Sequence, residues 1–460
     1  MTAQLLWAPR AWIHGAWQDD VLLRVGGDGC WATVQRGVPA PDGAQVLTGA
    51  VLPGLVNAHS HAFQRAFAGL AERREGGQDD FLSWRDRMYG VALRITPEQL
   101  RAVAVQLFTE LLQGGYTQIC EFHYLHHSES GAPYADPLAM SRVLVDAASS
   151  VGIGLTLLPV LYQRAGFAQA TLRDDQRRFA TRLPQLLALR DGVRALGAPL
   201  VSAGVALHSL RAVPEDALRA LVRAVADDPG PIHIHIAEQT GEVDDCLAAT
   251  GARPIEWLAR ELPLDARWQL VHATHAQPAE IDAVAASGAG VVLCPSTEAN
   301  LGDGLADLPR WLASGTPLSL GSDSQVCRHG PEELRWLEYG QRLALRQRNV
   351  AARPEIGIPA TAARLLGRLL AGGAAAAGFE RWGLVPGARA DLLVIDGQAP
   401  GLLGVPASHV LDALVFASGA PMFSEVWVAG QRVVASGVHR HAGTAAEAFK
   451  QAMQSIWSTP

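Results

Sequence analysis

Hydrophobic residues follow two alternating patterns along most of this chain. Short apolar runs bounded by turn residues are typical of buried strands, and longer segments with apolar residues every three or four positions are typical of amphipathic helices. The expected strands are a run that ends near His59 and then Gln118 to Phe122, Gly154 to Val160, Ser202 to Leu207, Pro231 to Ile236, Trp268 to Val271, Gly290 to Leu293 and Leu318 to Gly321. Eight strands alternating with helices predict an α/β fold, a parallel (β/α)8 barrel of the TIM type.

The intervening helices carry recognisable start and stop residues. The segment Pro97 to Gln113 begins with a proline and is followed by two glycines, as expected at the two ends of a helix. Pro214 to Ala226 and Gln277 to Ala286 have a similar pattern, and the Ala- and Leu-rich segment Pro359 to Ala376 closes the barrel. Active sites of such barrels lie at the C-terminal ends of the strands, so functional residues are expected just after the apolar runs.

Both ends of the chain instead show short strands separated by turns. The N-terminal ones are Leu5 to Trp7, Ala11 to Ile13, Val21 to Val25 and Trp31 to Val34, and the C-terminal ones are Asp391 to Asp396, Val410 to Phe416 and a hairpin over Glu425 to Val434. The N-terminal segment is too small to bury a core of its own. We therefore expect residues 1–51 and 379–460 to form one small β-sandwich domain beside a barrel made of residues 52–378.

Composition excludes several classes of function. The 460 residues are 49% hydrophobic and carry a formal net charge of -7, without a run of Lys or Arg, so neither nucleic acid nor an anionic membrane is an expected partner. No apolar stretch reaches the length of about 20 residues that spans a bilayer, and the N-terminus does not resemble a signal peptide. The five cysteines are scattered, without CxxC spacing, which favours reduced thiols in a cytoplasmic enzyme.

Histidines at the ends of two predicted strands suggest a metal site. Successive strand side chains point to opposite faces, so His59 and His61 point the same way and could chelate one divalent ion, although a pair of core histidines is compatible with the same pattern. His235 follows the same logic on a later strand, where His233 is expected deeper in the barrel as a hydrogen-bonded core residue. Glu238 comes three residues later and is either functional or a solvent-facing helix start.

Two further polar residues follow apolar runs near the expected open end of the barrel. Asp323 comes just after the last strand, where it could also cap a helix, and His272 could be a ligand or a base beside the metal. Three imidazoles and a carboxylate form a set suited to Zn²⁺, or to Fe²⁺, with room for water. Because the fourth strand region offers His208 and Arg211 and no lysine or further carboxylate, we interpret the site as mononuclear.

In this set of residues the chain resembles the amidohydrolase superfamily, in particular its mononuclear deaminase branch. The set consists of His59, His61, His235, Glu238, His272 and Asp323. Residues 57–65, 121–124, 207–211 and 294–304 are similar to the formimidoylglutamate deiminases of histidine degradation, and the paired termini resemble the composite β-domain of the superfamily. The resemblance implies a homodimer that binds one zinc per chain through His59, His61, His235 and Asp323. It implies hydrolytic deimination of a small dicarboxylate, N-formimino-L-glutamate, to N-formyl-L-glutamate and ammonia.

The resemblance also implies roles for the remaining site residues. Asp323 and His272 would take a proton from water and orient it, and Glu238 would pass a proton to the departing nitrogen. The substrate contacts would be Gln64, Arg85, Tyr124, His208 and Arg211. For three of these, local alternatives are open: Tyr124 as a half-buried loop aromatic, Gln64 as a helix-start residue and Arg85 as an ion-pair partner of Asp86 or Glu75.

Three other functions are compatible with parts of the pattern. The nearest is a purine- or pterin-type deaminase of the same branch. Its pocket would need aromatic stacking surfaces and amide hydrogen-bond partners, and it would have little need for two arginines. A metal-dependent amide hydrolase would need a bridged pair of metals. A binding scaffold without catalysis is the weakest alternative, because an acid/base set accompanies the metal ligands.

Overall fold

The protein forms a parallel barrel with a mixed sheet at one end, shown by a computed structural model that describes residues 4–74, 79–419 and 422–458. The barrel strands, in chain order, are β6 (Leu55–Ser60), β7 (Tyr116–His123), β8 (Gly154–Leu161), β10 (Val205–Ser209), β11 (Ile232–Ile236), β12 (Trp268–His272), β13 (Gly290–Leu293) and β14 (Leu318–Leu320). All neighbours are parallel, and the ring closes where β14 pairs with β6 and where β10 pairs with β8. This arrangement confirms the predicted barrel.

The fourth predicted strand is divided in two. Short β9 (Val201–Ala203) and β10 both pair with β8, and Gly204 lies between them. A Cβ atom at Gly204 would lie 2.4 Å from the carbonyl oxygen of Pro231, so only glycine allows this close approach of the backbones.

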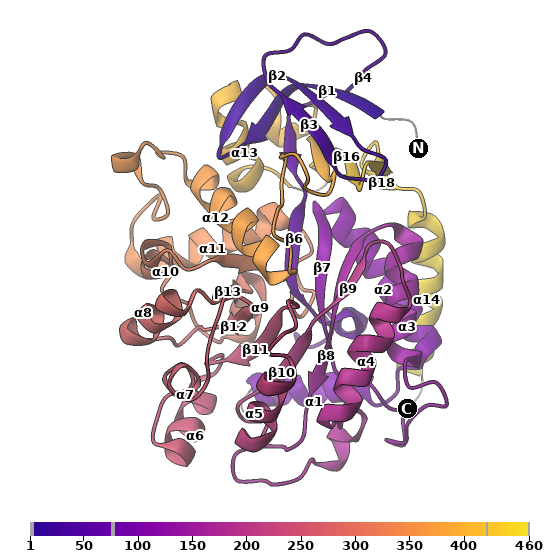
Figure 1. Ribbon diagram of the computed structural model, residues 1–460, viewed down its shortest axis with the longest axis vertical. Coiled ribbons are helices and arrows are strands. Elements are labelled where there is room, and N and C mark those ends of the chain that lie inside the picture. The colour runs from indigo at the N-terminus through magenta and orange to yellow at the C-terminus, as the bar shows by residue number, and fades with distance from the viewer. Residues whose placement is uncertain (1–3, 75–78, 420–421, 459–460) are drawn as a thin grey trace.

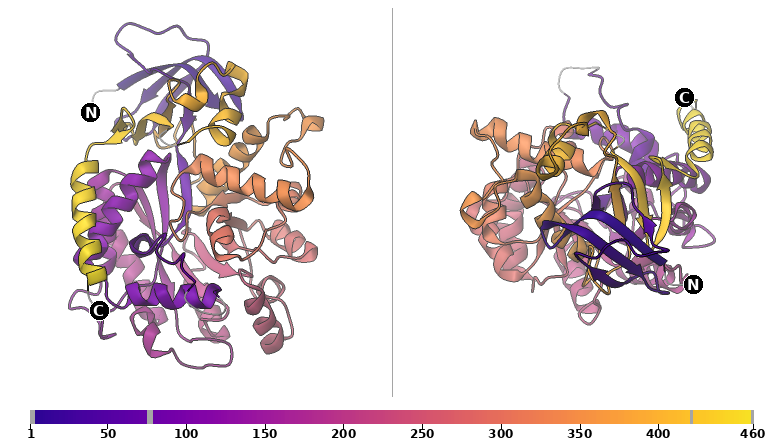
Figure 2. Two further views of the ribbon diagram at one scale, coloured as in Figure 1. Left: turned by 180° about the vertical axis from the view of Figure 1, so that it is seen from behind. Right: turned by 90° about the horizontal axis from the view of Figure 1, so that it is seen from above.

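Helices surround the barrel strands (Figures 1 and 2). They are α1 (Phe81–Ala92), α2 (Pro97–Gln113), α3 (Ala139–Val151), α4 (Leu183–Ala195), α5 (Glu215–Ala224), α6 (Thr240–Thr250), α7 (Pro254–Glu261), α8 (Pro278–Ser287), α9 (Pro295–Leu301), α10 (Leu308–Ser314), α11 (Gly330–Leu345) and α12 (Thr361–Ala376), with 3-10 turns η1 (Ala62–Ala66), η2 (Asp174–Phe179) and η3 (Pro354–Ile356). Helix α2 has the expected bounds because Thr96 and Gln99 form a capping box and Pro97 occupies its first position. No helix in the described part of the chain is long and apolar enough to cross a membrane.

Strands from both termini form one continuous mixed sheet, as predicted because the N-terminal segment is too small to bury a core of its own. Its hydrogen-bonded order is β18-β17-β16-β15-β5-β1-β2-β3, with β4 paired to β1. The strands are β1 (Gln4–Ile13), β2 (Ala16–Val25), β3 (Trp31–Gln35), β4 (Gln45–Val46), β5 (Val51–Pro53), β15 (Leu392–Ile395), β16 (Phe423–Val428), β17 (Gln431–Ala435) and β18 (Val438–His439). Side chains from both termini, among them Leu23, Trp31, Leu392 and Trp427, share a core separate from that of the barrel.

The prediction of a strand over Val410 to Phe416 is wrong, because this segment is helix α13 (Val410–Phe416), preceded by turns η4 (Pro400–Leu402) and η5 (Ala407–His409). Leu411, Leu414 and Val415 are buried on one face, as a helical period requires. The Asp412 carboxylate accepts a hydrogen bond from the backbone of Ala362 at the start of α12. A short apolar run does not distinguish a buried strand from a buried helix.

The last helix, α14 (Ala442–Ser458), leaves the small sheet and lies along α2 of the barrel (Figure 2). Gln99 donates a hydrogen bond of 2.9 Å to Ser455, and the Trp457 indole donates one of 3.0 Å to the carbonyl of Ala66. The division of the chain at residues 51 and 378 stays a prediction. The packing of α14 indicates that residues after 378 support the barrel as well as the sheet.

Candidate active site

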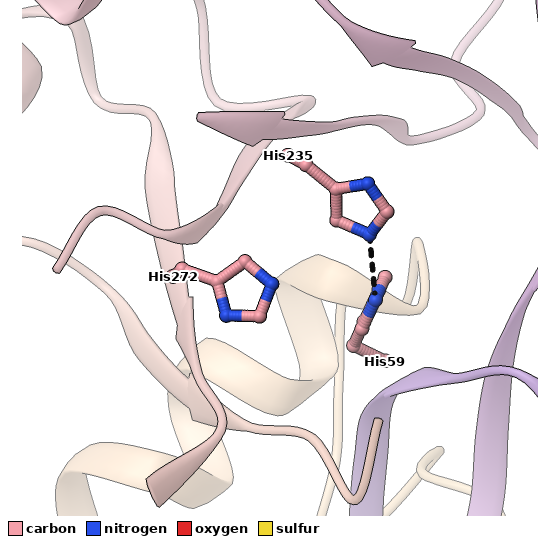
Figure 3. A group of neighbouring side chains, drawn as sticks. All are labelled: His59, His235 and His272. Carbon is pink, nitrogen blue, oxygen red and sulfur yellow. Dashed lines mark hydrogen bonds between the residues drawn. The ribbon is translucent and has the colours of Figure 1, made fainter. Parts of the chain in front are cut away.

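Four of the predicted metal ligands and catalytic residues lie where parallel strands end. His59 is near the end of β6, His235 is in β11, His272 ends β12, and Asp323 follows β14. Strand β6 begins two residues after β5 of the small sheet, so the C-terminal ends of the barrel strands point away from that sheet (Figure 1). Figure 3 shows that His59, His235 and His272 come from separate strands and point toward one another.

The ring nitrogens of three histidines meet at one point. The Nε2 atom of His59 lies 3.1 Å from Nε2 of His61 and 2.9 Å from Nε2 of His235. The Asp323 Oδ1 atom lies 3.3 Å from Nε2 of His61 and 3.5 Å from Nε2 of His59. These four side chains are buried, so the structure brings together every predicted metal ligand.

The chemistry of this donor set fits a divalent cation. Burial lowers the pKa of His59 to about 3 and lowers the pKa values of His61 and His235 as well, so the rings are neutral and have lone pairs to donate. Burial opposes ionisation of Asp323, yet its contacts with His59 and the nearby His272 lower its pKa overall. Neutral imidazoles and an ionised carboxylate form a typical zinc set.

Neighbouring groups fix the orientation of these side chains. The Nδ1 atom of His61 lies 2.9 Å from the carbonyl oxygen of Phe122, which sets the tautomer that leaves Nε2 free. Asn57 on β6 and Ser322 before Asp323 exchange two hydrogen bonds, of 2.7 and 2.9 Å. This pair joins the strands that carry His59 and Asp323. His233 lies deeper, 2.8 Å from the carbonyl of Ala376, in the core position predicted for it.

His272 lies among three carboxylates. Its Nε2 atom is 3.7 Å from Glu238 and 3.9 Å from Asp323, whereas its Nδ1 atom faces Glu298 at 3.4 Å. Burial by itself lowers the pKa of His272, but the Glu238 charge, followed by contacts with Cys294 and Glu298, raises it well above its ordinary value. His272 also belongs to a set with His59 and His235 whose ligand atoms lie within 4.8 Å of one another. The carboxylates around His272 favour a role for this residue in holding and transferring a proton.

Glu238 faces the cavity and not the solvent, so the helix-start alternative does not describe it. It lines the same cavity as His272 and Asp323, and burial raises its pKa to about 7. The Glu242 carboxylate accepts hydrogen bonds from the backbone of Glu238 at 3.0 Å and of Ala237 at 3.3 Å, which fixes the turn that carries Glu238. A carboxyl group with a pKa near 7 can both hold and release a proton at neutral pH.

The predicted substrate contacts line a single cavity next to this cluster. The space free of atoms in and in front of the cavity is about 540 Å³, and part of it is open to solvent. Residues from the predicted substrate set that line it are Gln64, Arg85, Tyr124, His208 and Arg211. Gln64 donates a hydrogen bond of 3.2 Å to the Tyr124 hydroxyl and its side-chain oxygen has no partner within the described residues. Tyr124 is buried, so it is not a half-exposed loop residue.

Two positive charges in this cavity have no carboxylate partner. Across residues 4–74, 79–419 and 422–458, neither Arg85 nor Arg211 has an Asp or Glu oxygen within ion-pair distance, and Asp86 instead faces Arg173 at 4.0 Å. Glu75, the other predicted partner of Arg85, lies outside the described residues. Arg85 packs over the Tyr89 ring, 5.7 Å from its centre. Unpaired guanidinium groups in a half-buried cavity can bind an anion through two parallel hydrogen bonds.

Sequence reasoning missed several residues of this cavity. Helix α1 contributes Trp84 and Tyr89 in addition to Arg85, and Tyr162 follows β8. Gln176 donates hydrogen bonds to the hydroxyl groups of Tyr89 and Tyr162, at 3.2 and 3.0 Å, so the two rings are held together. The spacing of Phe81, Trp84, Arg85 and Met88, which all line the cavity, was the available signal, because positions i, i+3, i+4 and i+7 lie on one face of a helix.

Comparisons with known proteins agree with this geometry. The amidohydrolase family profile matches residues 50–433. The chain is 47% identical over 449 residues to a formimidoylglutamate deiminase from Pseudomonas aeruginosa, covering 97% of this chain and 98% of that protein. It is 41% identical to an amidohydrolase from Brucella melitensis of known crystal structure, with a TM-score of 0.92 over 98% of this chain and 99% of that one.

A more distant structure has the same fold. An adenosine deaminase from Xanthomonas campestris, solved with bound zinc, superposes with a TM-score of 0.81 at 23% identity over 99% of both chains. The barrel, the buried histidine cluster at its C-terminal end and the match of the family profile to most of the sequence lead to one assignment: the chain belongs to the amidohydrolase family.

Proposed function

We propose that the protein is a zinc-dependent formimidoylglutamate deiminase, which hydrolyses N-formimino-L-glutamate to N-formyl-L-glutamate and ammonia in histidine degradation. The observation that carries this proposal is the pair of arginines, Arg85 and Arg211, that face the same cavity as the metal cluster without carboxylate partners among the described residues. The near full-length similarity to the Pseudomonas aeruginosa enzyme supports it.

The proposed substrate matches the charges of the cavity from end to end. It carries two carboxylates and a cationic formimino group. The arginines suit the carboxylates, and the carboxyl groups of half-buried Glu238 and buried Asp323 suit the cationic end. Gln64 and His208 line the cavity with Tyr124 and supply further hydrogen-bonding groups.

The chain's own residues can perform the proton transfers of hydrolysis. His59, His61, His235 and Asp323 would hold zinc, which makes hydroxide available from water near neutral pH. His272 and Asp323 accept the proton of the attacking water, whose oxygen forms a bond to the formimino carbon. Glu238 then donates a proton to the terminal nitrogen as the carbon–nitrogen bond breaks, so that ammonia leaves, and the Glu238 carboxylate takes up the remaining hydroxyl proton as the formyl carbonyl forms.

Three further features belong to the proposal, and each has its own test. One zinc per chain is proposed from the donor set of His59, His61, His235 and Asp323 and is measured by elemental analysis. A homodimer is proposed from the family resemblance and is measured by light scattering. A cytoplasmic location is supported by the five cysteines, none of which forms a disulfide, and is measured by fractionation of cells that express the protein.

The main rival is a purine-type deaminase, which the aromatic rings of Tyr89, Tyr124 and Tyr162 in the cavity favour. The deciding experiment measures ammonia release by the zinc-loaded enzyme from formimino, guanidino and purine compounds. N-formimino-L-glutamate is expected to be turned over with the highest kcat/KM. Faster turnover of a purine, without release of ammonia from formiminoglutamate, would refute the proposal.

A further inference from the structure

Gln176 joins two tyrosines of the cavity from a position behind it. It lies in η2 and is fully buried. Its Nε2 atom donates hydrogen bonds of 3.2 Å to the hydroxyl of Tyr89 and of 3.0 Å to the hydroxyl of Tyr162. Tyr89 is on α1 and Tyr162 directly follows β8, and both buried side chains line the cavity. One amide group therefore fixes two hydroxyl groups that belong to separate segments of the chain.

The orientation of the Gln176 amide follows from its third hydrogen bond. Its Oε1 atom accepts a hydrogen bond of 3.1 Å from the backbone N–H of Arg173, a group that can only donate. The amide oxygen therefore lies on the side of Arg173, and the NH2 group lies on the side of the two hydroxyls. Because an amide NH2 group donates two protons and accepts none, both hydroxyl oxygens are acceptors toward Gln176.

The protons of these hydroxyls stay available for another acceptor. A phenol hydroxyl donates as well as accepts, and burial raises the pKa of Tyr162, so that its O–H is kept at neutral pH. The hydroxyls of Tyr89 and Tyr162 also interact with each other, which uses one O–H at most. Across residues 4–74, 79–419 and 422–458, neither hydroxyl donates to a carbonyl or a carboxylate. At least one O–H is therefore left to donate to a ligand.

The surroundings of the two hydroxyls favour an anionic ligand. The charges of Arg211 and Arg85 both act on the ionisation of Tyr162, and both arginines line the same cavity. A carboxylate has two oxygens that only accept, so it can bind a guanidinium and a hydroxyl proton together. A carboxamide has one acceptor oxygen, and its NH2 group would face the protons of these donors without a partner.

We propose that Gln176 is a positioning residue that makes Tyr89 and Tyr162 a hydrogen-bond donor pair toward one carboxylate of the substrate, and that this pair selects a carboxylate over a carboxamide. The inference rests on the proposed function for the identity of the substrate, but the donor arrangement belongs to the chain itself. Without the Gln176 amide the hydroxyls can rotate and accept, so a carboxamide is tolerated at the same place.

Binding of the reaction product tests the inference without turnover. Isothermal titration calorimetry on the zinc-loaded protein gives Kd for N-formyl-L-glutamate and for its two mono-amides, N-formyl-L-glutamine and N-formyl-L-isoglutamine. The wild type should bind the diacid more tightly than either amide, and equal binding of all three compounds would overturn the inference.

Removal of single hydroxyls locates the donor. At least one of Tyr89→Phe and Tyr162→Phe should raise Kd for the diacid about 10- to 100-fold, the scale of a hydrogen bond to a charged group, and should bind one of the two amides nearly as the wild type does. The control is Tyr116→Phe, which removes another buried hydroxyl, outside the cavity. Wild-type values of Kd in both cavity variants would refute the inference.

Two variants of Gln176 separate positioning from general destabilisation. Gln176→Met should lower the preference for the diacid over one amide about tenfold, because the hydroxyls are no longer fixed as donors. Gln176→Glu should weaken binding of the diacid further, because its carboxylate accepts the hydroxyl protons itself. Gln341→Met, at a buried glutamine that donates to the carbonyl of Ala306, is the control. A structural role alone would weaken the diacid and both amides equally, and this result would contradict the inference.

Turnover distinguishes this inference from the proposed function. Gln176→Met should raise KM for formiminoglutamate about tenfold and leave kcat nearly unchanged, as expected when a contact binds substrate and transition state equally. Turnover by the wild type, with KM and the Kd ratios unchanged in Gln176→Met, would refute the inference and leave the proposed function in place. If the wild type shows the expected preference among the product ligands but releases no ammonia from formiminoglutamate, the proposed function fails and the donor pair stands.

Discussion

Replacement of Arg211 tests the assignment of the substrate most directly. Arg211 follows β10 by two residues, and its backbone carbonyl accepts a hydrogen bond of 3.0 Å from Arg164. Its guanidinium lines the cavity without a carboxylate partner in the described parts of the chain. Arg211→Met should therefore remove a substrate contact without breaking an internal ion pair, and the fold should be preserved.

The size of the effect follows from the kind of contact. A charge-assisted hydrogen bond contributes about 1.5 to 3 kcal/mol, and about 1.4 kcal/mol corresponds to a factor of ten. The kcat/KM of Arg211→Met on formiminoglutamate should thus fall about 10- to 150-fold. Arg211→Lys should lie between the two enzymes, because an ammonium group keeps the charge but cannot form two parallel hydrogen bonds to a carboxylate.

The assay compares the full substrate with two truncated ones. N-formimino-4-aminobutyrate lacks the α-carboxylate, and N-formimino-2-aminobutyrate lacks the side-chain carboxylate. The truncated compound without the partner of Arg211 should be a poor substrate for the wild type and lose little more in Arg211→Met. Arg223→Met, a change of an exposed arginine on α5, is the control. If Arg211→Met processes formiminoglutamate as well as the wild type does, the dicarboxylate assignment is refuted and the purine-type alternative becomes the better hypothesis.

Three further changes test other parts of the site and the fold. His235→Ala should remove both bound zinc and turnover while circular dichroism shows a folded protein, and full zinc occupancy in this variant would contradict the ligand assignment. Glu238→Gln should keep its zinc and a near-normal KM but lose about 10²- to 10⁴-fold in kcat, the scale of a positioned acid or base; a near-normal kcat would rule that role out. Burial raises the pKa of Glu333 to about 8, so this group keeps its proton when the unfolded chain has lost it, and its contribution to the free energy of unfolding falls as pH rises from its unfolded value to about 8. Glu333→Gln should remove up to about 1.4 kcal/mol per pH unit of that dependence, as measured by chemical denaturation between pH 5.5 and 7.5, and an unchanged slope would show that Glu333 is not protonated.

The barrel was predictable because its strands are fully buried. Such strands are continuous apolar runs, and the helices between them have a different period, so the alternation is visible without other information. The pattern failed where contacts with distant parts of the chain decide the local structure. Val410–Phe416 is short and apolar, and only its packing on α11 and α12 makes it a helix. The break at Gly204 depends on the approach of Pro231, which no local pattern encodes.

The meeting of the four proposed metal ligands was predictable for a similar reason. Parallel strands end at one edge, so His59, His61, His235 and Asp323 had to meet once the strands were assigned correctly. The surroundings of His272 were not predictable. Glu298 lies on α9, the helix that follows the neighbouring strand β13, and which group its side chain contacts depends on the direction of that side chain. The aromatic rings of α1 reach the cavity only through the path of the long segment after β6, which sequence patterns do not fix.

Backbone strain connects these observations. Five of the eleven non-glycine residues with positive φ in the described ranges lie at the C-terminal edge of the barrel, at Ala237, His272, Ala273, Asp323 and Gln325. Each such conformation costs roughly 1 to 3 kcal/mol, so local preference does not explain them. Reciprocal backbone contacts hold them, since Asp323 donates to the carbonyl of His59 at 3.0 Å and accepts from the backbone N–H of His61 at 3.3 Å. The strain thus lies at or next to the residues proposed as ligands and proton carriers, as expected of a site whose shape is held by the chain itself.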